Sequence, residues 1–111
     1  MSESDWSAAV TGSPLAADFV AACTHAREVS VLATVESLVH WDEQTMLPQQ
    51  AGGFRADQAA AMAAVVHTRR IDPAQGERLA RLAESELAVT GSAAVRATIR
   101  LLHEDFIKQS R

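Results

Sequence analysis

The stretch from Val39 to Gln58 separates two long helical patterns, and it constrains the fold more than any other part of the sequence. Pro48 cannot donate a backbone hydrogen bond inside a helix, and the pair Gly52 and Gly53 lowers helix stability. A single helix therefore cannot continue through this stretch. Because helical periodicity resumes after it, we expect the chain to reverse direction here and to place two helices as antiparallel neighbours.

The residues before this break predict one long helix, from Ser13 to about Gln44. Ser13 can cap the helix, and Pro14 suits the first helical position because its missing N–H would be unsatisfied there anyway. At about 1.5 Å per residue, some 30 residues span about 45 Å. Val31 and Leu32 lie off the main apolar stripe, so we expect two buried faces midway along this helix. The main stripe consists of Leu15, Phe19, Cys23, Ala26, Val29, Ala33, Val35, Leu38 and Val39.

Three shorter helices are predicted after the break. The second helix covers about residues 53–70, and the third covers about residues 73–90, with Asp72 as its cap and a proline in its first position. Gln75 stands where the partner in a capping box would reach back to the cap. Ser92 caps the fourth helix. The three apolar stripes are Phe54, Gln58, Ala61, Met62, Val65 and Val66; Leu79, Leu82, Ala83 and Leu87; and Val95, Ile99, Leu102 and Phe106.

These patterns predict an all-α fold in which four antiparallel helices, with a long first helix, form a bundle-like arrangement. No segment shows sustained period-two alternation, so we expect no strand. Residues 13–111 are predicted to form a single helical domain, a normal size for one hydrophobic core. Residues 1–12 are predicted to form a flexible, serine-rich arm that Trp6 pins to the domain.

Composition and charge argue against several classes of protein. The net charge is −4, whereas nucleic-acid-binding proteins usually present a basic face. No stretch approaches the roughly 18 apolar residues that span a bilayer, and the polar N-terminus does not resemble a signal peptide. The lone Cys23 rules out an intramolecular disulfide and a cysteine-based zinc site. We therefore expect a cytoplasmic protein that binds neither nucleic acid nor membrane.

The motif nearest to catalytic chemistry is His103-Glu104. A zinc peptidase helix needs His-Glu-x-x-His, because residues four apart point the same way and can share a metal ion. Ile107 occupies the place of the second histidine, so this motif cannot form. We expect no catalytic residue, no cofactor-binding residue and no metal ligand. Two further carboxylate–histidine pairs, interpreted as surface pairs rather than as a metal site between helices, are His25 with Glu28 and Glu36 with His40.

A short pattern at the break carries a family resemblance. It reads Trp-Asp-x-x-Thr-x-x-Pro over residues 41–48 and Arg-Ala-x-Gln over residues 55–58. The pattern resembles the N-terminal segment of the M32 metallocarboxypeptidases (carboxypeptidase Taq family), although Leu47 stands where that family usually has methionine. Weaker similarity extends over about residues 15–111. The matching positions are Trp41, Asp42, Thr45, Pro48, Arg55 and Gln58 at the break, and His67, Asp72, Pro73, Gly76, Val95 and Arg96 beyond it.

The resemblance implies a helical protein whose relatives are much longer, usually dimeric, and remove C-terminal residues from peptides with a divalent metal ion. Their His-Glu-x-x-His helix and their other metal and substrate residues lie well beyond the N-terminal region. The resemblance therefore carries over a structural element and no catalytic residue. We interpret Trp41 as filling the corner beneath the turn, and Asp42 as bonding backbone N–H groups or Arg55. Alternatively, Trp41 and Asp42 line a binding groove.

Two hypotheses for function follow. The first is a non-catalytic helical module that acts in self-association, as a homodimer through the long first helix, or in binding another protein or peptide. Helices of about 25 Å cannot cover one of about 45 Å, so Val31, Leu32 and Val35 would need a partner. The second is a fragment or partner of a metal-dependent carboxypeptidase that contributes to peptide hydrolysis. A truncated product without a role is disfavoured, because the helix caps and apolar stripes are intact throughout.

Overall fold

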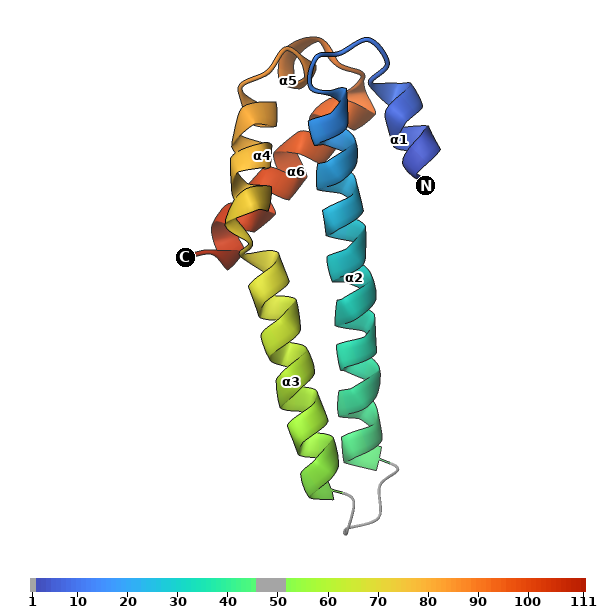
Figure 1. Cartoon of the computed structure of the whole chain (residues 1–111), viewed down its shortest axis with the longest axis vertical. Helices are drawn as coiled ribbons and strands as arrows, with labels where there is room; N and C mark the ends of the chain where they lie inside the picture. The colour runs from blue at the N-terminus through green and yellow to red at the C-terminus, as the bar shows by residue number, and fades with distance from the viewer. Residues whose placement is uncertain (1, 46–51) are drawn as a thin grey trace. The chain divides into compact units, whose positions relative to one another are not determined.

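The computed structural model describes the backbone of residues 2–45 and 52–111, and the side chains of residues 2–41 and 53–111. Within these ranges every regular element is a helix, so the predicted all-α class is confirmed. None of the described helices has the length and apolar character of a membrane span. Figure 1 shows the helices α1 (Glu3–Ala9), α2 (Ala16–Thr45), α3 (Gly52–Arg70), α4 (Pro73–Ala83), α5 (Leu87–Thr90) and α6 (Ala93–Gln109).

The predicted set of four helices is corrected in two places. A short helix, α1, precedes the long helix α2, and the helix predicted over residues 73–90 is divided into α4 and α5. Ser85 lies at this division, where its N–H and its hydroxyl both donate to the carbonyl of Leu82, at 3.1 and 2.7 Å. A serine that bonds back to the chain in this way competes with continued helix, which accounts for the end of α4.

The chain divides into two compact units. The first, which we call the core unit, combines residues 1–27 with residues 71–111; the second, the hairpin unit, consists of residues 28–70. Helix α2 begins in the core unit and ends in the hairpin unit. The domain predicted over residues 13–111 therefore contains parts of both units, and its behaviour as one domain stays a prediction.

The core unit holds the main hydrophobic core. Leu82 of α4 is 0% exposed, and α6 crosses α4 and packs against it (Figure 1). The apolar stripe predicted for α6 is confirmed, because its first two members are buried and Leu102 and Phe106 pack against the same cluster. The buried members of the cluster are Val10, Phe19, Ala22, Cys23, Leu79, Leu82, Leu87, Val95 and Ile99.

The segment predicted as an arm is helical over α1. The carboxylate of Asp5 accepts hydrogen bonds from the N–H and the hydroxyl of Ser2, at 2.9 and 3.0 Å. The backbone bond, and then the hydroxyl bond, hold the pKa of Asp5 below its ordinary value. Val10 is buried in the core, and Trp6 packs against the core as predicted. Flexibility of residues 1–12 stays a prediction.

The start of α2 follows the predicted capping chemistry. Gly12 has φ +86°, a conformation that glycine adopts far more readily than other residues, and it turns the chain after α1. The Ser13 hydroxyl oxygen accepts from the N–H of Leu15 at 3.1 Å, and the hydroxyl donates to Oε1 of Glu86 at 2.8 Å. Ser13 is thus a cap, although the regular helix begins at Ala16.

The start of α4 is confirmed at its cap and corrected at Gln75. Oδ1 of Asp72 accepts from the N–H of Ala74 at 3.0 Å, as a cap should. Gln75 does not reach back to the cap. It is buried, with Nε2 donating to the carbonyl of Ala22 at 3.1 Å and Oε1 accepting from Arg78 at 2.6 Å. A buried amide needs partners inside the protein, and Ala22 of α2 and Arg78 of α4 supply them.

The hairpin unit contains the C-terminal part of α2 and all of α3, which run antiparallel and side by side (Figure 1). Nη2 of Arg69 and Oε2 of Glu28 lie 3.5 Å apart and form an ion pair within this unit. Ala59 and Val66 of α3 are buried, and Met62 is half-buried. These positions define the inward side of α3.

The inward stripe predicted for α3 is right at Gln58, Met62 and Val66 and wrong at its other three positions. Phe54 is 68% exposed, and Ala61 and Val65 are also exposed. Arg55 and Ala59 complete the half-buried and buried side instead. Alanine occurs on several sides of this helix, so apolar spacing alone leaves its rotation undetermined.

Candidate functional site

The residues singled out at the break are only partly within the described structure. Pro48 lies outside the described residues. Asp42 and Thr45 belong to α2, but their side chains also lie outside the described set. The interpretation of Asp42 as a partner of backbone N–H groups or of Arg55 therefore stays a prediction.

Arg55 and Gln58 contact each other on α3. Nη1 of Arg55 donates to Oε1 of Gln58 at 2.9 Å, and both side chains are half-buried. The aliphatic part of an arginine can cover apolar surface while its guanidinium keeps a polar partner. The pair thus occupies the first part of the inward side of α3, and its predicted structural role stays a prediction.

Trp41 is 56% exposed. The turn that it is predicted to pack beneath includes residues 46–51, which lie outside the described residues, so this interpretation of Trp41 stays a prediction. Indole rings are enriched at protein interfaces, because they bury a large apolar area and lose few rotamers in doing so. Trp41 stands three residues after Leu38, near the exposed apolar side of α2.

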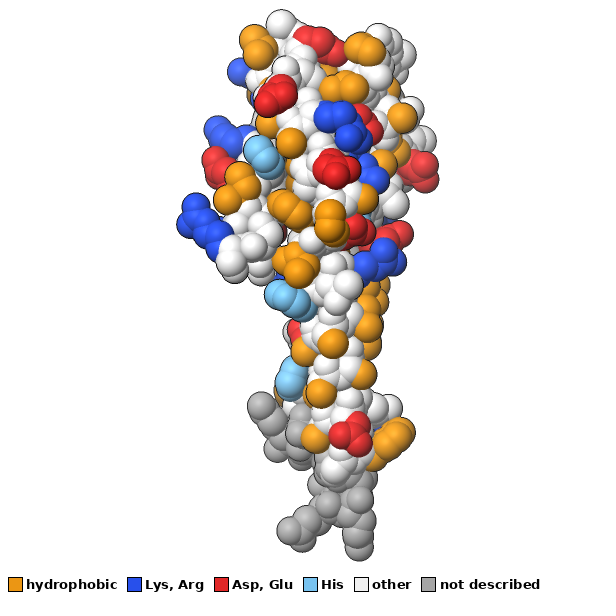
Figure 2. Space-filling view, turned by 60° about the vertical axis from the view of Figure 1, so that its left-hand side comes forward, with side chains coloured by type: hydrophobic (Ala, Val, Ile, Leu, Met, Phe, Trp, Pro, Cys, Tyr) orange, Lys and Arg blue, Asp and Glu red, His pale blue; other side chains and the backbone are white. Residues whose placement is uncertain are grey.

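We call this exposed apolar side, formed by Val31, Val35 and Leu38, the outer face of α2. The three side chains are 56%, 40% and 60% exposed. Their spacing of four and three residues places them on one side of the helix. Figure 2 shows hydrophobic side chains exposed on the hairpin unit, without separating α2 from α3. The remaining apolar residues of this part of α2, all half-buried, are Val29, Leu32, Ala33 and Val39.

Polar residues near the outer face use their hydroxyl groups within the helix. The Thr34 hydroxyl donates to the carbonyl of Ser30 at 2.9 Å, and the Ser37 hydroxyl donates to the carbonyl of Ala33 at 3.1 Å. Donors that are already bonded to the backbone make this side of α2 less polar than its composition suggests.

The two buried faces predicted midway along the helix are corrected to one half-buried side and one exposed side, because Leu32 is half-buried and Val31 is exposed.

Two of the three residues of the outer face are predicted from the sequence to be uncovered. Val31 and Val35 were expected to be uncovered and are exposed, whereas Leu32 is half-buried. Leu38 was assigned to the main stripe, yet it lies with Val31 and Val35. The spacing of these three residues was the available signal, and the long run of apolar positions around α2 concealed it.

The described histidines and the cysteine do not gather into a cluster. No group of three or more His, Cys, Asp or Glu side chains that could hold a metal ion occurs among the described residues. His103 and Glu104 lie on α6, and Ile107, where a second histidine would stand, is 41% exposed. Burial raises the pKa of the Cys23 thiol to about 11, so it stays protonated at neutral pH and packs as a small apolar side chain.

Asp18 and Arg81 form an ion pair between α2 and α4 within the core unit. Nε and Nη2 of Arg81 donate to the two carboxylate oxygens of Asp18, at 3.1 and 3.2 Å. The hydrogen bond from Arg81 is the main reason why the pKa of Asp18 lies below its ordinary value. This two-point contact holds the helices in register and leaves the guanidinium on the surface.

Comparison with known proteins gives two matches in sequence. A model of the family described as carboxypeptidase Taq (M32) metallopeptidase matches residues 21–111. Thermostable carboxypeptidase 1 of Thermus thermophilus is 41% identical over 61 residues, which is 55% of this chain and 12% of that relative. The chain thus matches about an eighth of the length of this relative. No solved structure matches the chain.

Proposed function

We propose a function for this chain from one premise: it belongs to the carboxypeptidase Taq (M32) metallopeptidase family. Its proposed role is that of a non-catalytic helical module that binds protein, and its first partner is a second copy of the chain. The outer face of α2 carries the proposal, because three apolar side chains are exposed on one side of a helix. The family resemblance supports it, since M32 relatives are usually dimeric.

The size of the outer face favours self-association over binding to a small polar partner. Burying a Val, Leu or similar side chain contributes about 1.5–3 kcal/mol, so the half-exposed Val31, Val35, Leu38 and Trp41 would each contribute about 1 kcal/mol. Association costs on the order of 4–15 kcal/mol, so the roughly 4 kcal/mol from one copy of these four side chains reaches only the lower end of that range. A two-fold interface uses the same side chains twice and gains about 8 kcal/mol, which exceeds the lower end. We therefore expect a weak dimer that depends on concentration.

Light scattering coupled to size-exclusion chromatography tests the dimer. At high concentration the mass should approach twice 11.9 kDa, and it should fall toward 11.9 kDa on dilution. Leu38→Glu should abolish the dimer, because it places a charge on the outer face, which the dimer would bury. Leu101→Glu is the matched control, since Leu101 is similarly exposed but lies on α6 in the core unit.

Two results would count against self-association. A mass of one chain at every concentration would exclude the dimer. Equal dissociation by Leu38→Glu and Leu101→Glu would show that a general increase in charge, rather than loss of the outer face, is responsible.

A second candidate function rests on the match to a carboxypeptidase. In this alternative the chain contributes to peptide hydrolysis as a fragment or partner of a metal-dependent carboxypeptidase, consistent with its coverage of 12% of the Thermus relative. Metal analysis after dialysis against zinc, together with an assay for release of C-terminal residues, discriminates the two proposals. Stoichiometric metal and release of amino acids would favour the second. We place the module in the cytoplasm under either proposal, in keeping with its lone, buried cysteine.

A further inference from the structure

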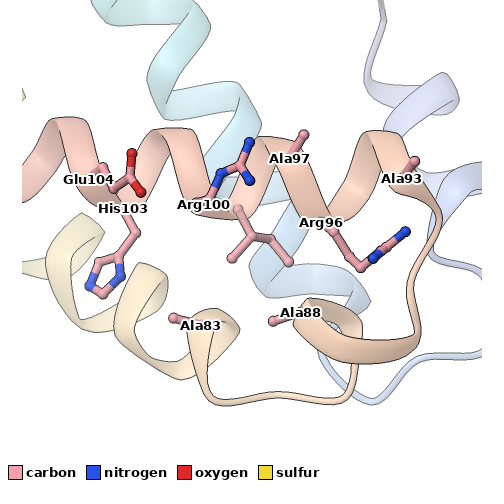
Figure 3. A pocket seen from close by; sticks show the side chains of 9 residues that line it. Ala83, Ala88, Ala93, Arg96, Ala97, Arg100, His103 and Glu104 are labelled. Carbon is pink, nitrogen blue, oxygen red and sulfur yellow. The ribbon is translucent and has the colours of Figure 1, made fainter.

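We propose that a hollow on the core unit binds an acidic peptide segment of a partner protein. The hollow lies along α6, next to the ends of α4 and α5, and has a volume of about 560 Å³ (Figure 3). This volume falls within the range of about 300–1,000 Å³ that is usual for ligand sites. The hollow shares no residue with the outer face of α2, so the inference is independent of the proposed self-association.

Small side chains create the hollow. Ala83 of α4 and Ala88 of α5 line it from one side, and Ala93 and Ala97 line it from α6 (Figure 3). Ile99, which is buried in the core, adds an apolar surface to the lining. Because these side chains are short or already packed, they leave an apolar recess that can hold a short aliphatic side chain.

Two arginines and a histidine border this apolar recess. Arg96 and Arg100 lie one turn apart on α6, and His103 follows one turn later, pointing toward α4 in Figure 3. Nε of Arg96 donates to the carbonyl of Gly91 at 3.1 Å, which fixes the guanidinium at one edge of the hollow. Its Nη atoms carry further N–H groups that can donate to a ligand.

The charges favour an anionic ligand. Like charges one turn apart on a helix repel each other, and none of the ion pairs within the described residues includes Arg96 or Arg100. Carboxylates bound to them would offset this repulsion and accept hydrogen bonds from the planar guanidinium groups. Glu104 contributes one negative charge to the lining, beyond Arg100 along α6 (Figure 3). The lining therefore has two cationic arginines and one anionic side chain.

The combination of an apolar recess and two arginines fits a peptide in which an acidic residue follows an aliphatic one. A nucleic acid is a poorer fit, because it requires a row of cations, whereas this chain has a net charge of −4. The aliphatic side chain would occupy the alanine-lined recess, and carboxylates would bind Arg96 and Arg100.

An NMR titration of the full chain with the peptide acetyl-Leu-Glu-Leu-Glu-amide tests the assignment. The Nε–Hε resonances of Arg96 and Arg100 and the backbone amide of Ala97 should shift on addition of this peptide. The neutral peptide acetyl-Leu-Gln-Leu-Gln-amide should shift them much less. Arg100→Gln should weaken binding about tenfold or more, the typical effect of losing a charged hydrogen-bond partner. Lys108→Gln removes a charge from the same helix outside the hollow and should leave binding unchanged.

Several outcomes would overturn the proposal. These are equal binding of the two peptides, equal weakening by Arg100→Gln and Lys108→Gln, or binding of inorganic phosphate as tight as that of the acidic peptide. Ala97→Leu provides a second test, because it fills the hollow with a side chain that favours helix. Its circular dichroism should match that of the unchanged chain while binding is lost, and retained binding would contradict the site.

Discussion

The core unit and the hairpin unit share helix α2 but use it in different ways. In the core unit α2 buries Phe19, Ala22 and Cys23 among residues of α4, α5 and α6. Beyond Cys23, no described residue of α2 is buried, and the outer face is open. Helix α3 is the other helix of the hairpin unit, and a helix with one neighbour can cover only one side. The number of neighbours, rather than the apolar content of α2, decides how much of it is buried.

The two units are expected to contribute to different properties: the core unit to stability, and the hairpin unit to assembly. Stability of the folded chain should reside mainly in the core unit, where large side chains have lost all contact with solvent. Substitutions at the exposed apolar positions of the hairpin unit should have little effect on the stability of the monomer. They should instead weaken its assembly. The predictions below test this difference, beginning with the largest expected effect.

Leu82→Ala should cause the largest loss of stability. Leu82 is 0% exposed, and removing its side chain from a packed core should cost about 2–5 kcal/mol of the free energy of unfolding. Leu38→Ala is the matched control in the hairpin unit and should cost less than about 0.5 kcal/mol in the monomer. Urea denaturation at low protein concentration measures both. Similar losses for the two variants would remove the distinction between the units.

Gly76→Ala should cause a smaller loss, and it tests close packing in the core unit. A Cβ atom at residue 76 would lie 2.5 Å from Cε1 of Phe106, so the two helices would have to separate or the ring would have to move. The cost should be about 1–3 kcal/mol, which exceeds the gain of about 1 kcal/mol in helix propensity. Gly53→Ala, in the hairpin unit, meets no atom within 4 Å and should be neutral or stabilising.

A double variant checks the cause of the Gly76→Ala effect. Adding Phe106→Leu should recover part of the lost stability, because it removes the ring that the new methyl group meets. A Gly76→Ala variant as stable as the unchanged chain would show that α4 and α6 are not packed as closely as the structure indicates.

Asp18→Asn should have the smallest effect and should depend on pH. The pKa of Asp18 in the folded chain lies below the ordinary value of 3.8, because Arg81 donates to the carboxylate. The ion pair therefore contributes its full stability above that ordinary value, and the contribution is lost as the pH falls through the folded pKa. The contribution is small, since the pair lies at the surface.

Thermal unfolding at about pH 7 and about pH 2 measures this dependence. Asp18→Asn should lower the Tm at the higher pH and should leave it unchanged at the lower pH. Arg81→Gln should reproduce the loss at the higher pH, and the double variant should lose no more than either single variant. Additive losses would show that the two side chains act independently.

The local signals in the sequence were sufficient for the caps and for the α6 stripe. Ser13, Asp72 and Ser92 each accept a backbone N–H at a helix start, as the sequence indicated. Capping depends on residues two or three apart, so it can be read without knowledge of the fold. Prediction from local spacing fails at Gln75. This side chain is buried against α2 and donates to the carbonyl of Ala22 instead of bonding back to the helix cap.

The candidate surfaces were less predictable than the helices. The residue pattern at the break identified the correct family. That pattern lies around Trp41, and it gave no information about which side of α2 is exposed. The hollow was missed because its alanines belong to three different helices, and only packing brings them together. Arginines one turn apart on α6 were the visible signal, and their significance depends on the alanines opposite.

By itself, the sequence determined the all-α class, the positions of the main helix starts and membership of the M32 family. These properties depend on residues that are close in the chain or on a pattern shared with relatives. The tertiary structure decided the rotation of α3, the division between α4 and α5, and which side of α2 stays exposed. Burial depends on the helices that pack against a given helix. When a helix has apolar residues on several sides, its sequence does not specify which side the neighbouring helices will cover.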